Sequence, residues 1–223
     1  MRFVTYIHAT KLVTVKNMVS KIVIVDYGMG NLQSVFRKFS LLGITPVVSK
    51  ELSTIKTADK LVLPGVGHFG KAIENLKTLG LYDVLNHSVL NKKTPILGIC
   101  LGMQLMTNQS EEGDVMGFGW VDAKVEKFRI NNTLEYKVPH VGWNQVDIKK
   151  ESRLMTGISN LSEFYFVHSY ACKCNDKDDV LNVSNYEIEF DSAFEKDNIF
   201  GVQYHPEKSF EAGKTLINNF VLL

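Results

Sequence analysis

Cys100 lies at the centre of Gly98-Ile99-Cys100-Leu101-Gly102, where a predicted buried strand at residues 95–99 meets a predicted helix at residues 101–108. Glycines two residues before and after the cysteine leave room for a sharp strand-to-helix turn that pushes its side chain outward. At a helix N-terminus, unpaired N–H groups and the helix dipole favour the nucleophilic thiolate. The pattern indicates a nucleophile elbow, although it also fits a buried cysteine in a glycine-containing turn.

His205 and Glu207 form a second reactive pair, in Tyr204-His205-Pro206-Glu207 after a predicted strand at residues 199–204. Pro206 favours an extended conformation at His205, and extended residues two apart point the same way. Glu207 can therefore orient the imidazole while its other ring nitrogen faces a nucleophile. A His-x-Glu pair by itself is more often an inert surface pair. Beside an elbow cysteine, it predicts a base and its orienting carboxylate.

The segment Pro64-Gly65-Val66-Gly67 is a glycine-rich corner after a predicted strand at residues 61–63. Open α/β sheets bind ligands at this carboxyl end of their strands, although an ordinary turn would also end a strand in this way. Attack on an amide creates an oxyanion that needs two backbone N–H donors. Leu101 directly follows the nucleophile and is one predicted donor; the other is expected from Gly65, Val66 or Gly67.

Other polar or reactive residues give weaker signals. The turn Asp26-Tyr27-Gly28-Met29-Gly30-Asn31 lacks the full dinucleotide-binding spacing, so we interpret it as structural or interfacial. His140 and His168 are isolated and lack metal-ligand spacing. The three cysteines are an odd number, below the four ligands of a structural zinc site, so we interpret Cys172 and Cys174 as structural. We expect neither a metal nor a cofactor.

Strands and helices alternate through the first half of the chain. Strands are predicted at residues 22–26, 46–49, 61–63 and 95–99, and helices at residues 32–39, 72–79, 81–90 and 101–108. Continuous apolar strands belong in a parallel sheet covered on both faces. The second half predicts strands at 125–128, 145–148, 163–171, 180–183, 192–194 and 199–204, then one helix at 209–221. We therefore predict an α/β fold with one doubly wound mixed sheet, parallel in its centre and extended by antiparallel strands.

Length and composition favour one ordinary globular domain. The chain has 223 residues, 45% of them hydrophobic and 22% charged. Its net charge of +1 comes from acidic and basic residues mixed along the sequence, which disfavours nucleic acids and anionic membranes as partners. No apolar run approaches the roughly 20 residues of a membrane helix, and no signal peptide is evident. We expect a cytoplasmic protein.

Three segments together resemble the class I (triad) glutamine amidotransferases, and the resemblance covers residues 21–223. These segments are Pro64-Gly65-Val66-Gly67, Gly98-Ile99-Cys100-Leu101-Gly102-Met103-Gln104 and Tyr204-His205-Pro206-Glu207. Four more are similar to the glutaminase subunits of imidazole glycerol phosphate synthases. They are the Asp26 to Asn31 turn, Pro139-His140-Val141-Gly142-Trp143-Asn144, Phe166-Val167-His168-Ser169-Tyr170 and His205-Pro206-Glu207-Lys208-Ser209.

The resemblance implies a flavodoxin-like fold and an enzyme that hydrolyses glutamine through a glutamyl thioester, with Cys100, His205 and Glu207 as its triad. Ammonia would pass to a (β/α)8-barrel cyclase subunit and be used on a phosphoribulosyl formimino nucleotide. The products would be imidazole glycerol phosphate, for histidine biosynthesis, and an aminoimidazole carboxamide ribotide. The resemblance also implies a glutamine pocket, an oxyanion donor that the partner orients, and contacts with that partner. The glutamine pocket would include Gln104, His168, Ser169 and Tyr170. The Val66 peptide would be the oxyanion donor, and Trp143 and Lys208 would contact the partner.

The two ends of the chain carry expectations of their own. Leu223 directly follows the last predicted helix, so we expect the cyclase to be a separate chain in a heterodimer. Residues 1–20 show no clean helical or strand period, and we interpret them as an N-terminal extension of unknown role before an amidotransferase domain at residues 21–223. Met18 would make a normal start for the family, so a start assigned too early is the alternative.

Three other functions compete with this one. A close relative of the same subunit, supplying ammonia for sugar amidation in surface polysaccharide synthesis, would carry nearly unchanged motifs and stays an alternative. A non-catalytic scaffold would not need an intact cysteine, histidine and glutamate in this order. A γ-glutamyl peptide hydrolase would need neither the segment at residues 139–144 nor Lys208.

Overall fold

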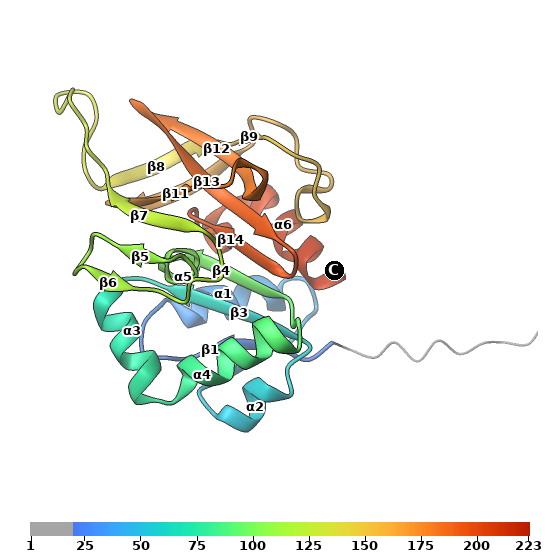
Figure 1. Cartoon of the computed structure of the whole chain (residues 1–223). Helices are drawn as coiled ribbons and strands as arrows, with labels where there is room; N and C mark the ends of the chain where they lie inside the picture. The colour runs from blue at the N-terminus through green and yellow to red at the C-terminus, as the bar shows by residue number, and fades with distance from the viewer. Residues whose placement is uncertain (1–19) are drawn as a thin grey trace, which may run out of the picture.

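The structure, a computed structural model, describes residues 20–223, so the predicted extension at residues 1–20 lies outside the described residues except for Ser20 (Figure 1). Its helices are α1 (Leu32–Ser40), α2 (Leu52–Lys56), α3 (Phe69–Thr78), α4 (Leu81–Asn86), α5 (Leu101–Leu105) and α6 (Phe210–Leu222). Its strands are β1 (Ile22–Val25), β2 (Val47–Ser49), β3 (Lys60–Gly65), β4 (Ile96–Cys100), β5 (Gln109–Ser110), β6 (Val115–Met116), β7 (Ala123–Lys127), β8 (His140–Gln145), β9 (Asp147–Ile148), β10 (Glu163–His168), β11 (Tyr170–Cys174), β12 (Val180–Tyr186), β13 (Ile188–Lys196) and β14 (Ile199–Val202).

The main sheet is parallel in its centre. Its strand order is β2-β1-β3-β4-β14-β13-β11-β7-β5-β6, with β12 and β9 attached beside β13. All pairs from β2 to β14 are parallel, whereas β14–β13, β13–β11 and β11–β7 are antiparallel. The predicted doubly wound sheet with an antiparallel extension is thus confirmed. Its central strand β4 carries Cys100 at its carboxyl end.

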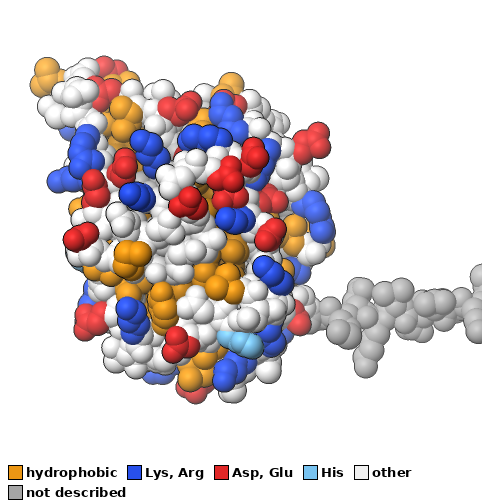
Figure 2. Space-filling model, viewed as in Figure 1, with side chains coloured by type: hydrophobic (Ala, Val, Ile, Leu, Met, Phe, Trp, Pro, Cys, Tyr) orange, Lys and Arg blue, Asp and Glu red, His pale blue; other side chains and the backbone are white. Residues whose placement is uncertain are grey.

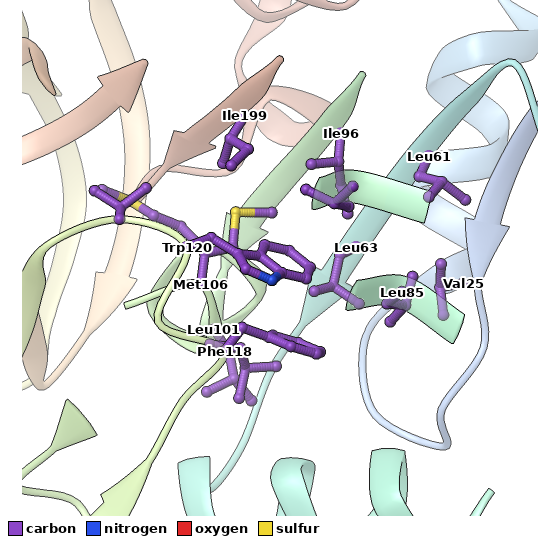
Figure 3. Close-up of a cluster of buried hydrophobic side chains, with 14 of the residues drawn as sticks. Val25, Leu61, Leu63, Leu85, Ile96, Leu101, Met106, Phe118, Trp120 and Ile199 are labelled. Carbon is purple, nitrogen blue, oxygen red and sulfur yellow. The ribbon is translucent and has the colours of Figure 1, made fainter. Parts of the chain in front are cut away.

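Helices cover both faces of the parallel strands, because alternate residues of each strand point to opposite sides. Val23 and Val25 of β1 pack in a core with α2, α3, α4 and α5, whereas Ile22 and Ile24 pack in a second core with α1 and α6. Figure 3 shows part of the first core, where Leu63 of β3 lies beside Trp120 and Ile96 of β4 belongs to the same cluster. A fully buried side chain of this kind contributes about 1.5–3 kcal/mol. The two cores hold the central strands and their carboxyl ends in place.

The second half departs from the prediction at Ser169. One continuous strand is predicted at residues 163–171, but the chain passes there from β10 to β11, which lie in different sheets. β10 pairs antiparallel with β8 from Glu163 to His168, and together they form a two-stranded sheet beside the main one. The strand predicted at residues 145–148 is likewise two elements, β8 and β9. Local alternation of side chains cannot reveal which sheet a strand joins.

The helix predicted at residues 101–108 is also too long. α5 ends at Leu105. The N–H group of Phe118 donates to the Leu105 carbonyl at 2.8 Å, and that of Trp120 donates to the Met106 carbonyl at 2.9 Å, so these carbonyls do not continue the helix. The chain then turns into the short strand β5, which the sequence does not signal. The short elements α2 and β6 are likewise outside the prediction. The remaining predicted elements are present with shifted ends.

The surface mixes both signs of charge. Figure 2 shows acidic and basic side chains interspersed over the face that it views. Among residues 20–223, no helix combines the length and the apolar character needed to cross a membrane.

Candidate active site

Cys100 occupies a strained turn between β4 and α5. Its backbone has φ 54° and ψ −111°, a conformation that costs a non-glycine residue about 1–3 kcal/mol and that clusters at functional sites. The sharp turn places the thiol beside the surrounding strands, where it donates a weak hydrogen bond to the Val167 carbonyl at 3.8 Å. The predicted elbow geometry is therefore present.

The glycines of the elbow are required by close packing. A Cβ atom on Gly102 would lie 1.7 Å from the carbonyl oxygen of Leu63 in β3. A Cβ atom on Gly98 would lie 2.8 Å from the main chain of Gly102 itself. Without these glycines, α5 could not approach the sheet closely enough to leave Cys100 in the turn.

His205 follows β14, the strand directly beside β4, which brings it to the same edge of the sheet as Cys100. Its Nδ1 atom lies 2.7 Å from Oε1 of Glu207, and both side chains are almost completely buried. His205 is extended, as predicted, but Pro206–Lys208 forms a 3-10 turn. The turn, rather than two residues of extended chain, carries Glu207 back to the imidazole.

The proton affinity of His205 reflects its neighbours. Burial lowers the pKa of the imidazole, but the neighbouring Cys100 and Glu207 side chains favour the charged ring, outweigh burial and raise the pKa to about 10. The second ring nitrogen, Nε2, is buried and has no well-formed hydrogen bond with any described residue. His205 is therefore suited to hold a proton taken from Cys100.

The Pro64 to Gly67 corner lies opposite the elbow. Gly65 pairs with Cys100 at the ends of β3 and β4, and Gly67 has φ 108°, in the region that favours glycine. Val66, Gly67 and Leu101 line the same cavity as Cys100. The structure thus brings both predicted sources of oxyanion donors to the nucleophile.

This cavity has a volume of about 300 Å³, at the lower limit for small-molecule sites. Its lining includes the predicted pocket residues Gln104, His168, Ser169 and Tyr170, together with Glu112, Pro139 and Val167, which are outside the predicted pocket. A larger hollow of about 780 Å³ lies over the loop between Ile148 and Ile158, but Cys100, which lines the smaller cavity, does not line it. The smaller cavity is the candidate active site.

Gln104 shapes the floor of the cavity. Its Nε2 atom donates to the Tyr170 carbonyl at 3.0 Å and to Oε1 of Gln203 at 2.9 Å. Gln203 in turn donates to the sulfur of Cys100 at 3.6 Å. Gln203 is fully buried and was not predicted, because it joins Cys100 and Gln104 only across about a hundred residues of sequence.

His168 lines the cavity, but both nitrogens of its imidazole already make hydrogen bonds within the protein. Nδ1 lies 2.8 Å from the Tyr170 carbonyl, so it carries the proton and donates, and Nε2 accepts from Nδ1 of His140 at 3.0 Å. Burial is the main cause that lowers the pKa of His140 to about 4 and that of His168 to about 3. This neutral histidine pair therefore braces the Tyr170 carbonyl that also receives Gln104.

The two predicted interface residues lie near the triad on the surface. Trp143 is 42% exposed and stacks on Phe210, which is 75% exposed, with ring centroids 4.8 Å apart. The Lys208 ammonium group lies 5.2 Å from the centre of the Tyr165 ring. Trp143, Phe210 and Lys208 leave an aromatic and basic surface next to Glu207.

The other two thiols do not line the candidate cavity. Cys172 and Cys174 are free and buried in the first core, and burial raises the pKa of both, to about 12 for Cys174. They are consequently poor nucleophiles, in keeping with their interpretation as structural. Within residues 20–223, no cluster of three or more His, Cys, Asp or Glu side chains could hold a metal ion.

Comparison with known proteins agrees with this geometry. The family described as class-I glutamine amidotransferase matches residues 23–223. Imidazole glycerol phosphate synthase subunit HisH 2 of Methanococcus maripaludis is 48% identical over 200 residues, covering 90% of this chain and 98% of the relative. The subunit of the same name from Pseudomonas aeruginosa is 44% identical over 202 residues, covering 91% of this chain and 99% of the relative.

Solved structures show the fold. A crystal structure of a glutamine amidotransferase matches with a TM-score of 0.68 and 16% identity, covering 90% of this chain and 97% of that chain. PurLQS from Thermotoga maritima matches with a TM-score of 0.67 and 15% identity, covering 92% of this chain and 99% of that chain.

Proposed function

Because this chain belongs to the class I glutamine amidotransferase family, we propose that it is the glutaminase subunit of an imidazole glycerol phosphate synthase. It hydrolyses glutamine to glutamate and ammonia, and the ammonia serves a cyclase subunit in histidine biosynthesis. The observation that carries the proposal is the elbow Cys100 next to the buried His205–Glu207 pair, with a small cavity in front of the thiol.

The first half of the reaction acylates the cysteine. Glutamine enters the cavity, the Cys100 sulfur attacks its side-chain amide carbon, and the thiol proton passes to His205. The amide oxygen takes the negative charge and accepts hydrogen bonds from the N–H of Leu101 and from a peptide of the Gly65 to Gly67 corner. When the carbon–nitrogen bond breaks, His205 returns the proton to the leaving nitrogen. Ammonia departs and a glutamyl thioester remains.

The second half releases glutamate. His205 removes a proton from water, the hydroxide attacks the thioester carbonyl, and the same oxyanion donors stabilise the charge. The carbon–sulfur bond breaks and the Cys100 thiolate recovers its proton from His205. Glu207 remains a carboxylate throughout and holds Nδ1–H, which fixes the tautomer that presents Nε2 to the sulfur and the substrate.

The ammonia has to reach a second active site. We propose that a separate (β/α)8-barrel cyclase subunit docks over Trp143 and Lys208 and uses the ammonia on its nucleotide substrate to form imidazole glycerol phosphate. Support comes from the names of the relatives and from the exposed Trp143–Phe210 stack beside the triad. The reaction requires neither metal nor cofactor in this subunit, and we place it in the cytoplasm.

Ammonia supply for sugar amidation is the second candidate, and the comparisons do not favour it, since relatives 44–48% identical to this chain carry synthase names. The deciding experiment supplies the chain with glutamine and a cyclase subunit. Formation of imidazole glycerol phosphate from the nucleotide substrate supports the proposal. Glutamate release without that product, but with amination of a nucleotide sugar by another partner, would support the second candidate.

The same experiment tests coupling between the subunits. Peptides beside glycine rotate at little cost, so the corner's N–H points reliably at the oxyanion only when something holds it. One missing donor costs about 10²–10³ in rate. We therefore expect slow glutamine hydrolysis by the isolated chain and a large increase when the cyclase and its substrate are bound. Full turnover of the isolated chain would contradict this expectation.

A further inference from the structure

Tyr27, in the turn after β1, has a hydroxyl group that the triad mechanism does not use. The side chain is completely buried, yet its Oη atom makes no hydrogen bond with any described residue. A buried polar group without a partner is rare in folded proteins and each instance needs a cause. The main chain of Tyr27 is well anchored, because its carbonyl accepts from Asn75 of α3 at 3.1 Å. The unpaired hydroxyl is therefore not explained by a loosely held turn.

The position of the hydroxyl links it to the oxyanion site. A Cβ atom on Gly65 would lie 2.3 Å from Oη of Tyr27, 2.9 Å from Cβ of Leu101 and 3.0 Å from the main-chain nitrogen of Gly102. The hydroxyl thus lies in the narrow gap between the end of β3 and the start of α5. These two segments supply the two oxyanion donors, one from the corner and one from Leu101. Only glycine at position 65 leaves this gap open.

We propose that Tyr27 is a positioning residue for the oxyanion site, whose hydroxyl donates to the Gly65 carbonyl when the next peptide turns its N–H toward the substrate. The N–H and C=O of a trans peptide point in opposite directions, so a Val66 N–H that faces the oxyanion sends the Gly65 carbonyl away from it. A carbonyl buried there needs a donor. The unpaired Tyr27 hydroxyl can supply that donor to the Gly65 carbonyl.

The protonation state of Tyr27 suits a donor. Burial, together with the nearby Cys100, raises the pKa of the phenol, so the hydroxyl keeps its proton over the working range of the enzyme. The hydrogen bond would form in the active arrangement of the corner and be absent in the arrangement seen here. The hydrogen bond therefore raises the rate of glutamine hydrolysis and does not stabilise the folded protein. This inference rests on the proposed glutaminase function.

The test is Tyr27→Phe, which removes only the hydroxyl, with Tyr82→Phe as a matched control. The Tyr82 hydroxyl donates to the Gly117 carbonyl at 3.0 Å, outside the cavity. For both variants of the full chain, in complex with the cyclase, glutamate release gives kcat and KM, and thermal unfolding gives Tm. We expect Tyr27→Phe to lower kcat about tenfold, less than the loss of a whole oxyanion donor, while KM and Tm stay unchanged. Tyr82→Phe should lower Tm and leave kcat unchanged.

Each other outcome overturns the inference. If Tyr27→Phe keeps the wild-type kcat, the hydroxyl does not act on the oxyanion site. If Tyr27→Phe loses kcat and Tm together, or raises KM alone, the hydroxyl supports the fold or the pocket instead. If the wild-type complex releases no glutamate, the proposed function itself fails and the inference fails with it.

Discussion

The Nδ1 atom of His205 lies 2.7 Å from Oε1 of Glu207, and the carboxylate reaches it through a 3-10 turn that starts at Pro206. The carboxylate orients the ring but takes no part in proton transfer. Glu207→Gln should therefore lower kcat less than His205→Ala does. We expect kcat of the Glu207→Gln variant to be about 10- to 100-fold higher than that of the His205→Ala variant. Steady-state glutaminase assays of both variants measure the difference. Glu211→Gln, at an exposed carboxylate of α6, is the control and should keep full activity. Equal losses at positions 205 and 207 would show that Glu207 does more than orient.

Gly102→Ala should destabilise the protein, because the new methyl group would lie 1.7 Å from the Leu63 main-chain oxygen. Either α5 or β3 must shift, and overpacking of this kind costs about 1–3 kcal/mol or more. Urea unfolding at neutral pH measures the change in the free energy of unfolding. Gly70→Ala in α3 is the matched control, since its methyl group would find no atom closer than 3.3 Å. If Gly102→Ala is as stable as Gly70→Ala, the packing explanation of the elbow glycines is wrong.

The His140–His168 pair predicts a loss of stability in acid. Burial holds the folded-state pKa values at about 4 and about 3, below the ordinary value of 6.5, so both rings are neutral when folded and take up protons more readily when unfolded. Stability is therefore fully present above pH 6.5 and lost as the pH falls through 4 toward 3. One pKa unit corresponds to about 1.4 kcal/mol, so we expect a loss of at least about 3 kcal/mol between pH 7 and pH 4.

The measurement is urea unfolding at several pH values. His140→Gln should be less stable at pH 7 but should lose less stability on acidification than the wild type. His87→Gln, at an exposed histidine, is the control and should follow the wild-type curve. A His140→Gln curve parallel to that of the wild type would rule out the buried pair as the source of the acid sensitivity.

A chain that begins at Met18 should keep its fold and its glutaminase activity. The two cores of the described residues begin with Ile22 and Val23 of β1, and Lys21 remains available to hydrogen bond with Asp59 at 2.7 Å. Thermal unfolding and glutamate release of the shortened chain test this expectation. A marked fall in Tm would show that residues 1–17 pack on the domain.

The reactive segments were predictable because each one is local. Glycines at positions 98 and 102 predict the elbow at Cys100. His205 and Glu207 are two residues apart, so each motif lies within a short stretch of sequence. Gln203 could not be predicted, because its contacts with Cys100 and Gln104 depend on how strands β4 and β14 pair.

The fold shows the same limit. Continuous apolar strands identified the parallel centre, but residues 163–171 carry one unbroken strand pattern across two sheets. The break at Ser169 depends on β10 pairing with β8 and β11 pairing with β7, which are contacts between distant segments.

Cys100→Ala separates release of ammonia from its use. In complex with the cyclase, the variant should lose synthesis driven by glutamine, because the thioester cannot form, yet retain synthesis driven by added ammonium salt. Cys172→Ala, which removes a buried thiol far along the chain in β11, is the matched control and should retain both activities. The measurement is imidazole glycerol phosphate formation with glutamine and with ammonium as alternative nitrogen sources. We predict near-complete loss with glutamine and wild-type rates with ammonium; continued synthesis from glutamine, or loss of both activities together, would contradict the assignment of Cys100 as the glutaminase nucleophile.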